Sequence, residues 1–124
     1  MLFCSPRSQC ASTGSKDGSR LMILGGYNYD DPEHSLHSGQ LVSSDDSLKE
    51  FRLPFHCRLS SAVTLSSGLV IVTGGMGCRT NVWSGIFSDQ PKFAKRNDMP
   101  VGRMGHSSVA FFKGRLFMIR SLEK

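Results

Sequence analysis

The chain has 124 residues, of which 39% are hydrophobic and 20% charged, with a formal net charge of +5. This length suits one small domain, and the composition excludes an intrinsically disordered chain. No apolar run approaches the roughly 18 residues of a membrane-spanning helix, and the first residues lack the apolar segment of a signal peptide. We therefore expect a protein of the cytoplasm or the nucleus.

The first predicted unit opens with a hairpin over residues 10–26, in which the polar turn GSKDGS joins two short strands. The second strand, RLMIL, ends in Gly25-Gly26. A polar loop over 27–38 follows, and then two weaker strands within QLV and SLKEFRLP. Glycine and serine interrupt every helical period, so four antiparallel strands are the better interpretation.

The second unit repeats this order. A hairpin is predicted over 59–75, with its turn at Ser66-Ser67-Gly68, and it ends in Gly74-Gly75, 49 residues after the first glycine pair. The loop 76–81 and two strands within VWSGIF and PKFAKRNDMP complete the unit. A repeat of this length is typical of stacked supersecondary units.

A third hairpin is predicted over 106–119. Residues 106–121 align with 60–75 and place Gly114 on Gly68, but Arg120-Ser121 stand where a third glycine pair is due. A four-stranded sheet that is apolar on both faces can bury both faces when it stacks radially against similar sheets, as in a β-propeller. We therefore predict an all-β fold, a partial propeller with two complete four-stranded antiparallel blades and one incomplete blade.

The residues of the repeat resemble those of the kelch family. The resemblance rests on the glycine pairs after apolar strands and on the segment MPVGRMGH at 99–106, which resembles the link between kelch units. PRSQC at 6–10 and LPFHCR at 53–58 look like degraded copies of this link, with Arg7 and Cys57 at the position of Arg103. The residues assigned to the structural kelch motif are Gly25, Gly26, Gly74, Gly75, Pro100, Arg103 and His106.

Aromatic positions follow the family less closely. Kelch units usually carry an aromatic residue in the third strand and a tryptophan in the fourth. Phe87 or Trp83 can fill the first role and Phe93 lies near the second, whereas Leu48 stands near the tryptophan position of the first unit.

The resemblance divides the chain, residues 1–124, into units at approximately 6–53, 54–99 and 100–121, the last truncated. Propellers close with four to eight blades. We therefore expect a piece of a longer kelch protein or a shortened product, whose partners include the remaining blades of a parent chain or a second copy of itself.

No cofactor, metal or catalytic site is predicted. Cys4, Cys10, Cys57 and Cys78 lack the paired spacing of zinc ligands, and Asp30-Asp31 lack a calcium-loop pattern. The glycine pairs lack the spacing of a phosphate loop. Arg103 and His106 are interpreted as structural, because no nucleophile or paired carboxylate accompanies them.

Antiparallel order brings two kinds of connection to one end of the sheets, the loops between second and third strands and the links between units. Tyrosine and arginine, the types often found as interface anchors, occur there. The candidate partner-binding residues are Tyr27, Tyr29, Asp30, His34, Arg58, Arg79 and Arg103.

The resemblance implies a non-enzymatic protein–protein interaction module. Many kelch proteins are substrate-recognition adaptors of cullin-type ubiquitin ligases, a role that here belongs to a parent chain. One alternative is a fragment of a kelch-fold oxidase, which needs tyrosine, histidine and cysteine ligands to copper. Another is nucleic-acid binding through the basic residues 92–124, although their charges are scattered and nucleic acid is the weaker alternative.

Overall fold

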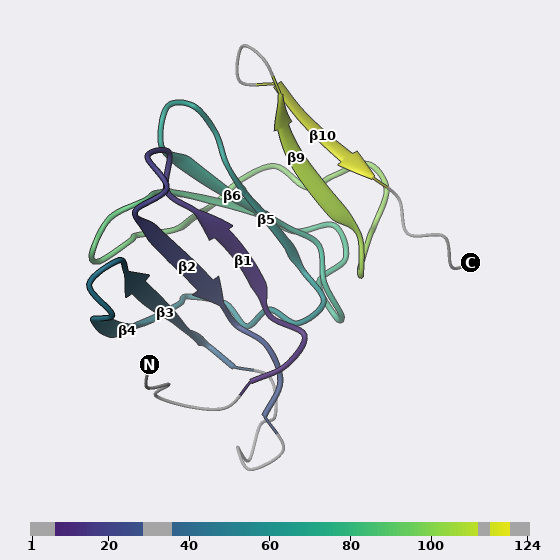
Figure 1. Cartoon of the computed structure of the whole chain (residues 1–124). Helices are drawn as coiled ribbons and strands as arrows, with labels where there is room; N and C mark the ends of the chain where they lie inside the picture. The colour runs from purple at the N-terminus through teal and green to yellow at the C-terminus, as the bar shows by residue number, and fades with distance from the viewer. Residues whose placement is uncertain (1–6, 29–35, 112–114, 120–124) are drawn as a thin grey trace.

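The structure is a computed structural model that describes residues 7–28, 36–111 and 115–119 (Figure 1). These residues form β-strands, turns and loops, so the all-β prediction is confirmed. No helix in the described part of the chain is long and apolar enough to cross a membrane.

Two four-stranded antiparallel sheets and one hairpin account for the strands. The first sheet consists of β1 (Ala11–Gly14), β2 (Arg20–Leu24), β3 (Ser38–Ser43) and β4 (Leu48–Arg52), paired in chain order. The second consists of β5 (Ser61–Thr64), β6 (Leu69–Thr73), β7 (Val82–Ile86) and β8 (Ala94–Lys95), again in chain order. β9 (Ser107–Phe111) and β10 (Arg115–Ile119) form the predicted third hairpin.

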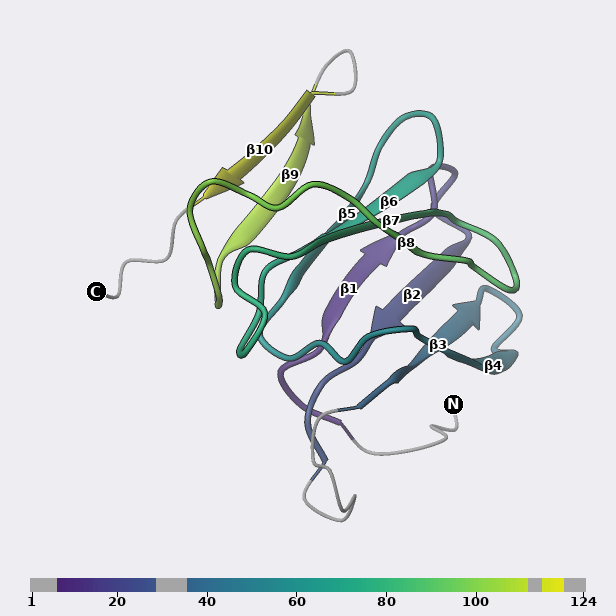
Figure 2. The ribbon, with the colours of Figure 1, turned by 180° about the vertical axis from the view of Figure 1, so that it is seen from behind.

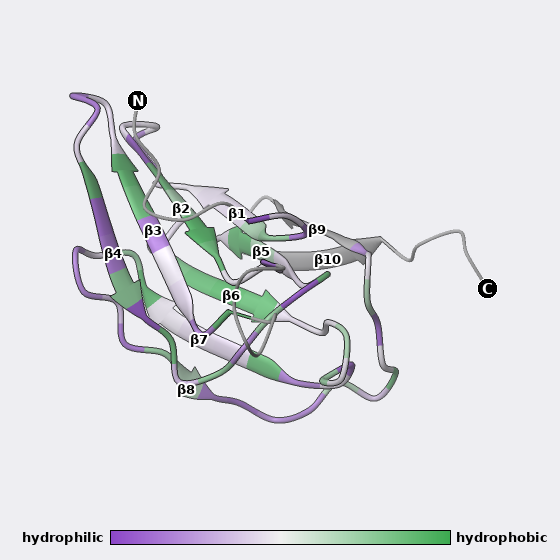
Figure 3. Ribbon diagram, turned by 90° about the horizontal axis from the view of Figure 1, so that it is seen from below, coloured by the Kyte–Doolittle hydropathy of each residue, from purple (hydrophilic) through white to green (hydrophobic). Residues whose placement is uncertain are grey.

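The three sheets fan out from a common inner edge. β1 packs beside β5, and β5 packs beside β9, so the first strand of each unit lies innermost. Figures 1 and 2 show β4 at the outer edge of the first sheet, and Figure 3 shows β8 at the outer side of the second. This radial order is the blade arrangement that the repeat predicted.

The core lies between the two four-stranded sheets. Met22, Leu24, Val70 and Val72 are at most 2% exposed, and they alternate with the more exposed Leu21, Ile23, Leu69 and Ile71 along β2 and β6. Figure 3 shows β2 and β6 as largely hydrophobic, whereas much of β4 is hydrophilic. Because successive side chains of a strand point to opposite faces, the alternation directs one row of each strand into the core.

Aromatic rings close the outer part of the core. Trp83, in the third strand of its sheet, stacks on Phe55 with ring centroids 4.5 Å apart, and Phe93 meets Phe55 edge-on at 5.7 Å. In the first sheet the buried aromatic residue of the fourth strand is Phe51, whereas Leu48 is half-buried. Comparison of the fourth strands by sequence position led to Leu48, but the pleat of β4 turns Phe51 inward.

Candidate partner-binding face

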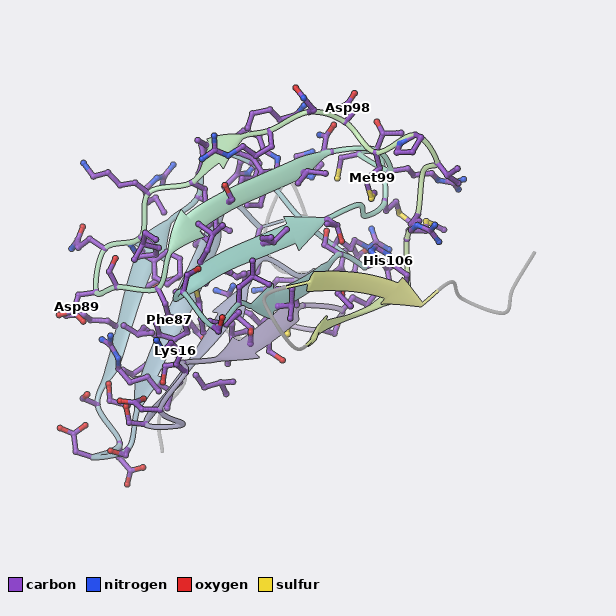
Figure 4. All side chains as sticks on the ribbon, turned by 90° about the horizontal axis from the view of Figure 1, so that it is seen from above. Lys16, Phe87, Asp89, Asp98, Met99 and His106 are labelled. Atoms are coloured by element: carbon purple, nitrogen blue, oxygen red, sulfur yellow. The ribbon has the colours of Figure 1, made fainter. Side chains whose placement is uncertain are left out.

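The site predicted from the sequence lies at one end of the sheets, which we call the linker face. It comprises residues 25–28 and 74–81, after β2 and β6, and the links 53–60 and 96–106. Figure 4 shows Met99 and His106 at this end, and Lys16, Phe87 and Asp89 at the opposite end. Antiparallel pairing in chain order places both kinds of connection together, as the sequence predicted.

Each glycine pair bonds to the link of the following unit. Gly26 N–H donates to Cys57 O at 2.6 Å, and Gly75 N–H donates to Arg103 O at 2.9 Å. Cys57 and Arg103 therefore occupy equivalent positions, in agreement with the alignment of the links. These bonds carry the chain from one blade to the next at the linker face.

The same approach leaves no room for a side chain. Gly25 and Gly74 have φ angles of 63° and 66°, in the left-handed region that favours glycine. A Cβ at Gly25 would collide with the backbone oxygen and the sulfur of Cys57. At Gly74 it would collide with Arg103 O and the His106 ring. Both the backbone angle and the packing therefore require glycine.

His106 ties the second link to β6. Its Nε2 lies 2.8 Å from Thr73 Oγ1, and the imidazole is 7% exposed. Burial lowers the pKa of His106, and the charge of Arg103 lowers it further. The buried Nδ1 has no hydrogen-bond partner among the described residues. By contrast, Pro100 is exposed.

Arg7 has a structural role that sequence analysis missed. Its side chain is 4% exposed and donates from one nitrogen to Gly25 O and Ser38 O, both at 2.9 Å. The carboxylate of Glu50 lies 3.5 Å from the other nitrogen. In the sequence, Arg7 aligns with Arg103, and this alignment was interpreted only as a degraded link. It did not indicate that the Arg7 guanidinium is buried and holds β2 to β3.

Tyr27 and Arg58 form the best-defined side-chain cluster on the linker face. The Arg58 guanidinium carbon lies 4.0 Å from the centre of the Tyr27 ring, a cation–π contact. Arg58 Nε also donates to Gln9 Oε1 at 2.7 Å. Two residues of the first unit therefore fix the orientation of a guanidinium that belongs to the link of the second unit.

Arg79 and Arg103 lie on two adjacent segments of the linker face. Arg103 N–H donates to Arg79 O at 2.9 Å, which holds the loop after β6 against the link. Arg79 is exposed and Arg103 is half-buried. The predicted binding residues Tyr29, Asp30 and His34 lie outside the described residues.

The arginines of the linker face carry charge that is not neutralised within the described parts of the chain. Arg58, Arg79 and Arg103 form no ion pair there. Several cations elsewhere are paired: Arg20 and Lys49 with Asp89, and Lys95 with Asp98. The linker face therefore offers three guanidinium groups to an anionic group in solution.

The three cysteines in the described part of the chain, Cys10, Cys57 and Cys78, have free thiols. Cys57 is 1% exposed, and burial, with a smaller effect of Cys78, raises its pKa to about 12, so the thiol stays protonated. Cys10 is exposed. Within the described residues, no three His, Cys, Asp or Glu side chains gather into a group that could hold a metal ion.

The opposite end of the sheets has a shallow hollow of about 270 Å³, lined in part by Lys16, Gly68 and Phe87. The Arg20 guanidinium carbon lies 5.4 Å from the Phe87 ring centre, and Asp89 pairs with the same guanidinium. Because Asp89 already neutralises the Arg20 guanidinium, this side chain is a weaker anchor for an anionic partner than Arg58, which has no ion pair in the described part of the chain.

Comparison with known proteins identifies the fold of this chain. No family model and no curated protein matches the sequence. A solved structure of YjhT, a kelch-repeat protein, matches 95% of this chain with a TM-score of 0.73 and 12% sequence identity. The match covers 39% of YjhT, so the chain spans about two fifths of that length. At this identity the likeness concerns architecture, and the chain has the fold of part of a kelch-type β-propeller.

Proposed function

We propose that the chain is a non-enzymatic protein-binding module, and that the linker face receives a partner segment that carries carboxylate groups. The observation that carries this proposal is the Arg58 side chain, which Tyr27 and Gln9 hold in place. Arg79 and Arg103 lie on the same face, and none of the three arginines is ion-paired within the described residues.

Physical chemistry favours this class of partner. A guanidinium can bind a carboxylate through two parallel hydrogen bonds, and its planar shape also stacks on an aromatic ring. A side chain that is already oriented loses less conformational entropy when it binds. Arg58 meets both conditions, because its Nε bond to Gln9 leaves the terminal nitrogens available for a ligand.

In a longer protein, this module would serve as the substrate-recognition part of a cullin-type ubiquitin ligase. The resemblance of the repeat to kelch proteins supports this role. The role requires a further domain that contacts the cullin, so it is a property of the parent protein, and the binding test below does not depend on it.

The test is fluorescence anisotropy with short labelled peptides of acidic, neutral and basic composition. We expect the acidic peptides to bind most tightly. Arg58→Ala should weaken their binding by about tenfold, because truncation of an interface anchor typically costs more than 1 kcal/mol. Lys16→Ala is the matched control, since it removes one exposed cation at the opposite end of the sheets.

Equal weakening by both substitutions would show a general charge effect and contradict the proposal. A labelled single-stranded DNA of similar charge is the competing ligand. Tighter and more salt-dependent binding of this DNA than of the acidic peptides would instead favour the nucleic-acid alternative.

A further inference from the structure

Three residues at equivalent positions of the links form a backbone hydrogen-bond ladder near the inner edge of the blades. Gln9, Leu59 and Gly105 each precede an inner strand by two residues, and their φ angles are 58°, 60° and 64°. Leu59 N–H donates to Gln9 O at 3.0 Å, and Gly105 N–H donates to Leu59 O at 2.8 Å. The same left-handed conformation thus recurs once in every unit, and it costs energy where the residue is not glycine.

The ladder has a direction. In both steps the N–H belongs to the later unit and the C=O to the earlier one. Hydroxyl groups of the inner strands also meet at each described junction: Thr13 Oγ1 lies 2.7 Å from Thr64 Oγ1, and Ser61 Oγ donates to Ser108 Oγ at 2.8 Å, from the earlier unit to the later one. The backbone hydrogen bond of the ladder therefore repeats at both described junctions, whereas the hydroxyl contacts lie at different positions along the strands.

The two ends of this ladder are complementary. Among the described residues, nothing accepts a hydrogen bond from Gln9 N–H and nothing donates one to Gly105 O. Both residues are exposed, and a Cβ on Gly105 would meet no atom within 4 Å. One end of the chain thus presents the donor and the other end the acceptor of the next step.

We propose that a second copy of this chain continues the ladder head to tail, with Gln9 N–H of one copy bonded to Gly105 O of the other. Each copy has three inner hairpins, β1–β2, β5–β6 and β9–β10, so two copies supply six. A head-to-tail contact closes into a ring when its rotation divides a full turn, and six blades lie within the four to eight with which propellers close. The assembly is then a closed dimer with both junctions satisfied.

The comparison supports a ring of this size. Because 95% of this chain corresponds to 39% of the YjhT chain, that chain is about 2.4 times as long. A propeller of that length leaves room for two copies of this chain. The second copy would also place a second set of the linker-face arginines around the same axis, although the dimer does not depend on the proposed function.

Sedimentation velocity of the 124-residue chain across the micromolar range tests the proposal. We expect a dimer for the natural sequence. Gly105→Arg should weaken it by at least about tenfold, because it places a long charged side chain at the acceptor end. The matched control is Gly18→Arg, since Gly18 also has a positive φ, 77°, and open space around it, but lies in the β1–β2 turn. The control should remain a dimer.

Each other result overturns the inference. A folded monomer of the natural chain shows that the ladder ends do not join, and open polymers show that two copies do not close. If both arginine variants still dimerise, or if both lose the dimer equally, Gly105 does not lie at the contact. Both variants replace a glycine of positive φ by arginine. Thermal melting verifies that both are folded.

Discussion

At the scale of single residues, close approach of backbones determines which positions must be glycine. Gly74 and Gly68 both have positive φ angles, 66° and 90°, but their surroundings differ. Gly74 faces Arg103 O and the His106 ring, whereas a Cβ at Gly68 would meet nothing within 4 Å. The backbone angles alone would predict the same cost for a side chain at both glycines. The packing around Gly74 makes that cost higher than at Gly68.

We therefore expect Gly74→Val to destabilise the protein by about 2 kcal/mol or more, and Gly68→Asn by less than about 1 kcal/mol. Valine adds a β-branched side chain where the link already fills the space. Asparagine tolerates positive φ, and Gly68 lies at a turn in which its N–H donates to Leu65 O at 2.9 Å. Thermal midpoints of the two variants measure the difference, and equal midpoints would contradict the packing argument.

At the scale of elements, the links between blades are as important as the strands. The link 96–106 bonds to Thr80 through Met99, to Arg79 through Arg103, and to Thr73 through His106. Its conformation therefore depends on a neutral His106. A protonated imidazole would add a positive charge near Arg103 and make both ring nitrogens donors, although the buried Nδ1 has no hydrogen-bond partner among the described residues.

The pKa shift of His106 predicts a pH dependence. Because its folded pKa is lowered, the unfolded chain binds the proton more readily, and stability decreases as pH falls below the unfolded value of about 6.5. We expect the free energy of unfolding of the natural chain to fall from pH 8 to pH 5 by more than that of His106→Gln. Urea unfolding at the two pH values measures this, and parallel pH profiles would refute it.

The strands could be predicted from the sequence to a greater extent than the links. Apolar runs that end in glycine pairs located β2 and β6, and the repeat located β9 and β10. The left-handed conformation of Gln9 and Leu59 could not be predicted, since neither residue type signals it. The burial of Arg7 also depends on the carbonyl groups of Gly25, which follows β2, and of Ser38 in β3, which only the fold brings together.

At the scale of the whole molecule, strands differ in how many neighbours they have. β6 pairs with β5 on one edge and β7 on the other, and Val70 and Val72 are buried. β8 pairs only with β7 through two residues, and both its side chains are exposed. Figure 3 shows β8 at the outer side of its blade. Local opening of β8 therefore breaks few contacts, whereas opening of β6 disrupts both of its neighbours and the core.

Hydrogen exchange should follow this order. We expect the amides of β6 to exchange most slowly, because their exposure requires opening close to global unfolding, and those of β8 to exchange fastest among the strands of that sheet. β4 is the internal comparison, since it is also the fourth strand of its sheet but pairs with β3 through five residues. Its protection should lie between the two. A dimer joined at the inner ladder leaves this order unchanged, because β8 lies away from the axis. Protection of β8 equal to that of β6 would mean that another surface covers the outer strand, and would contradict the stability order derived from the pairing.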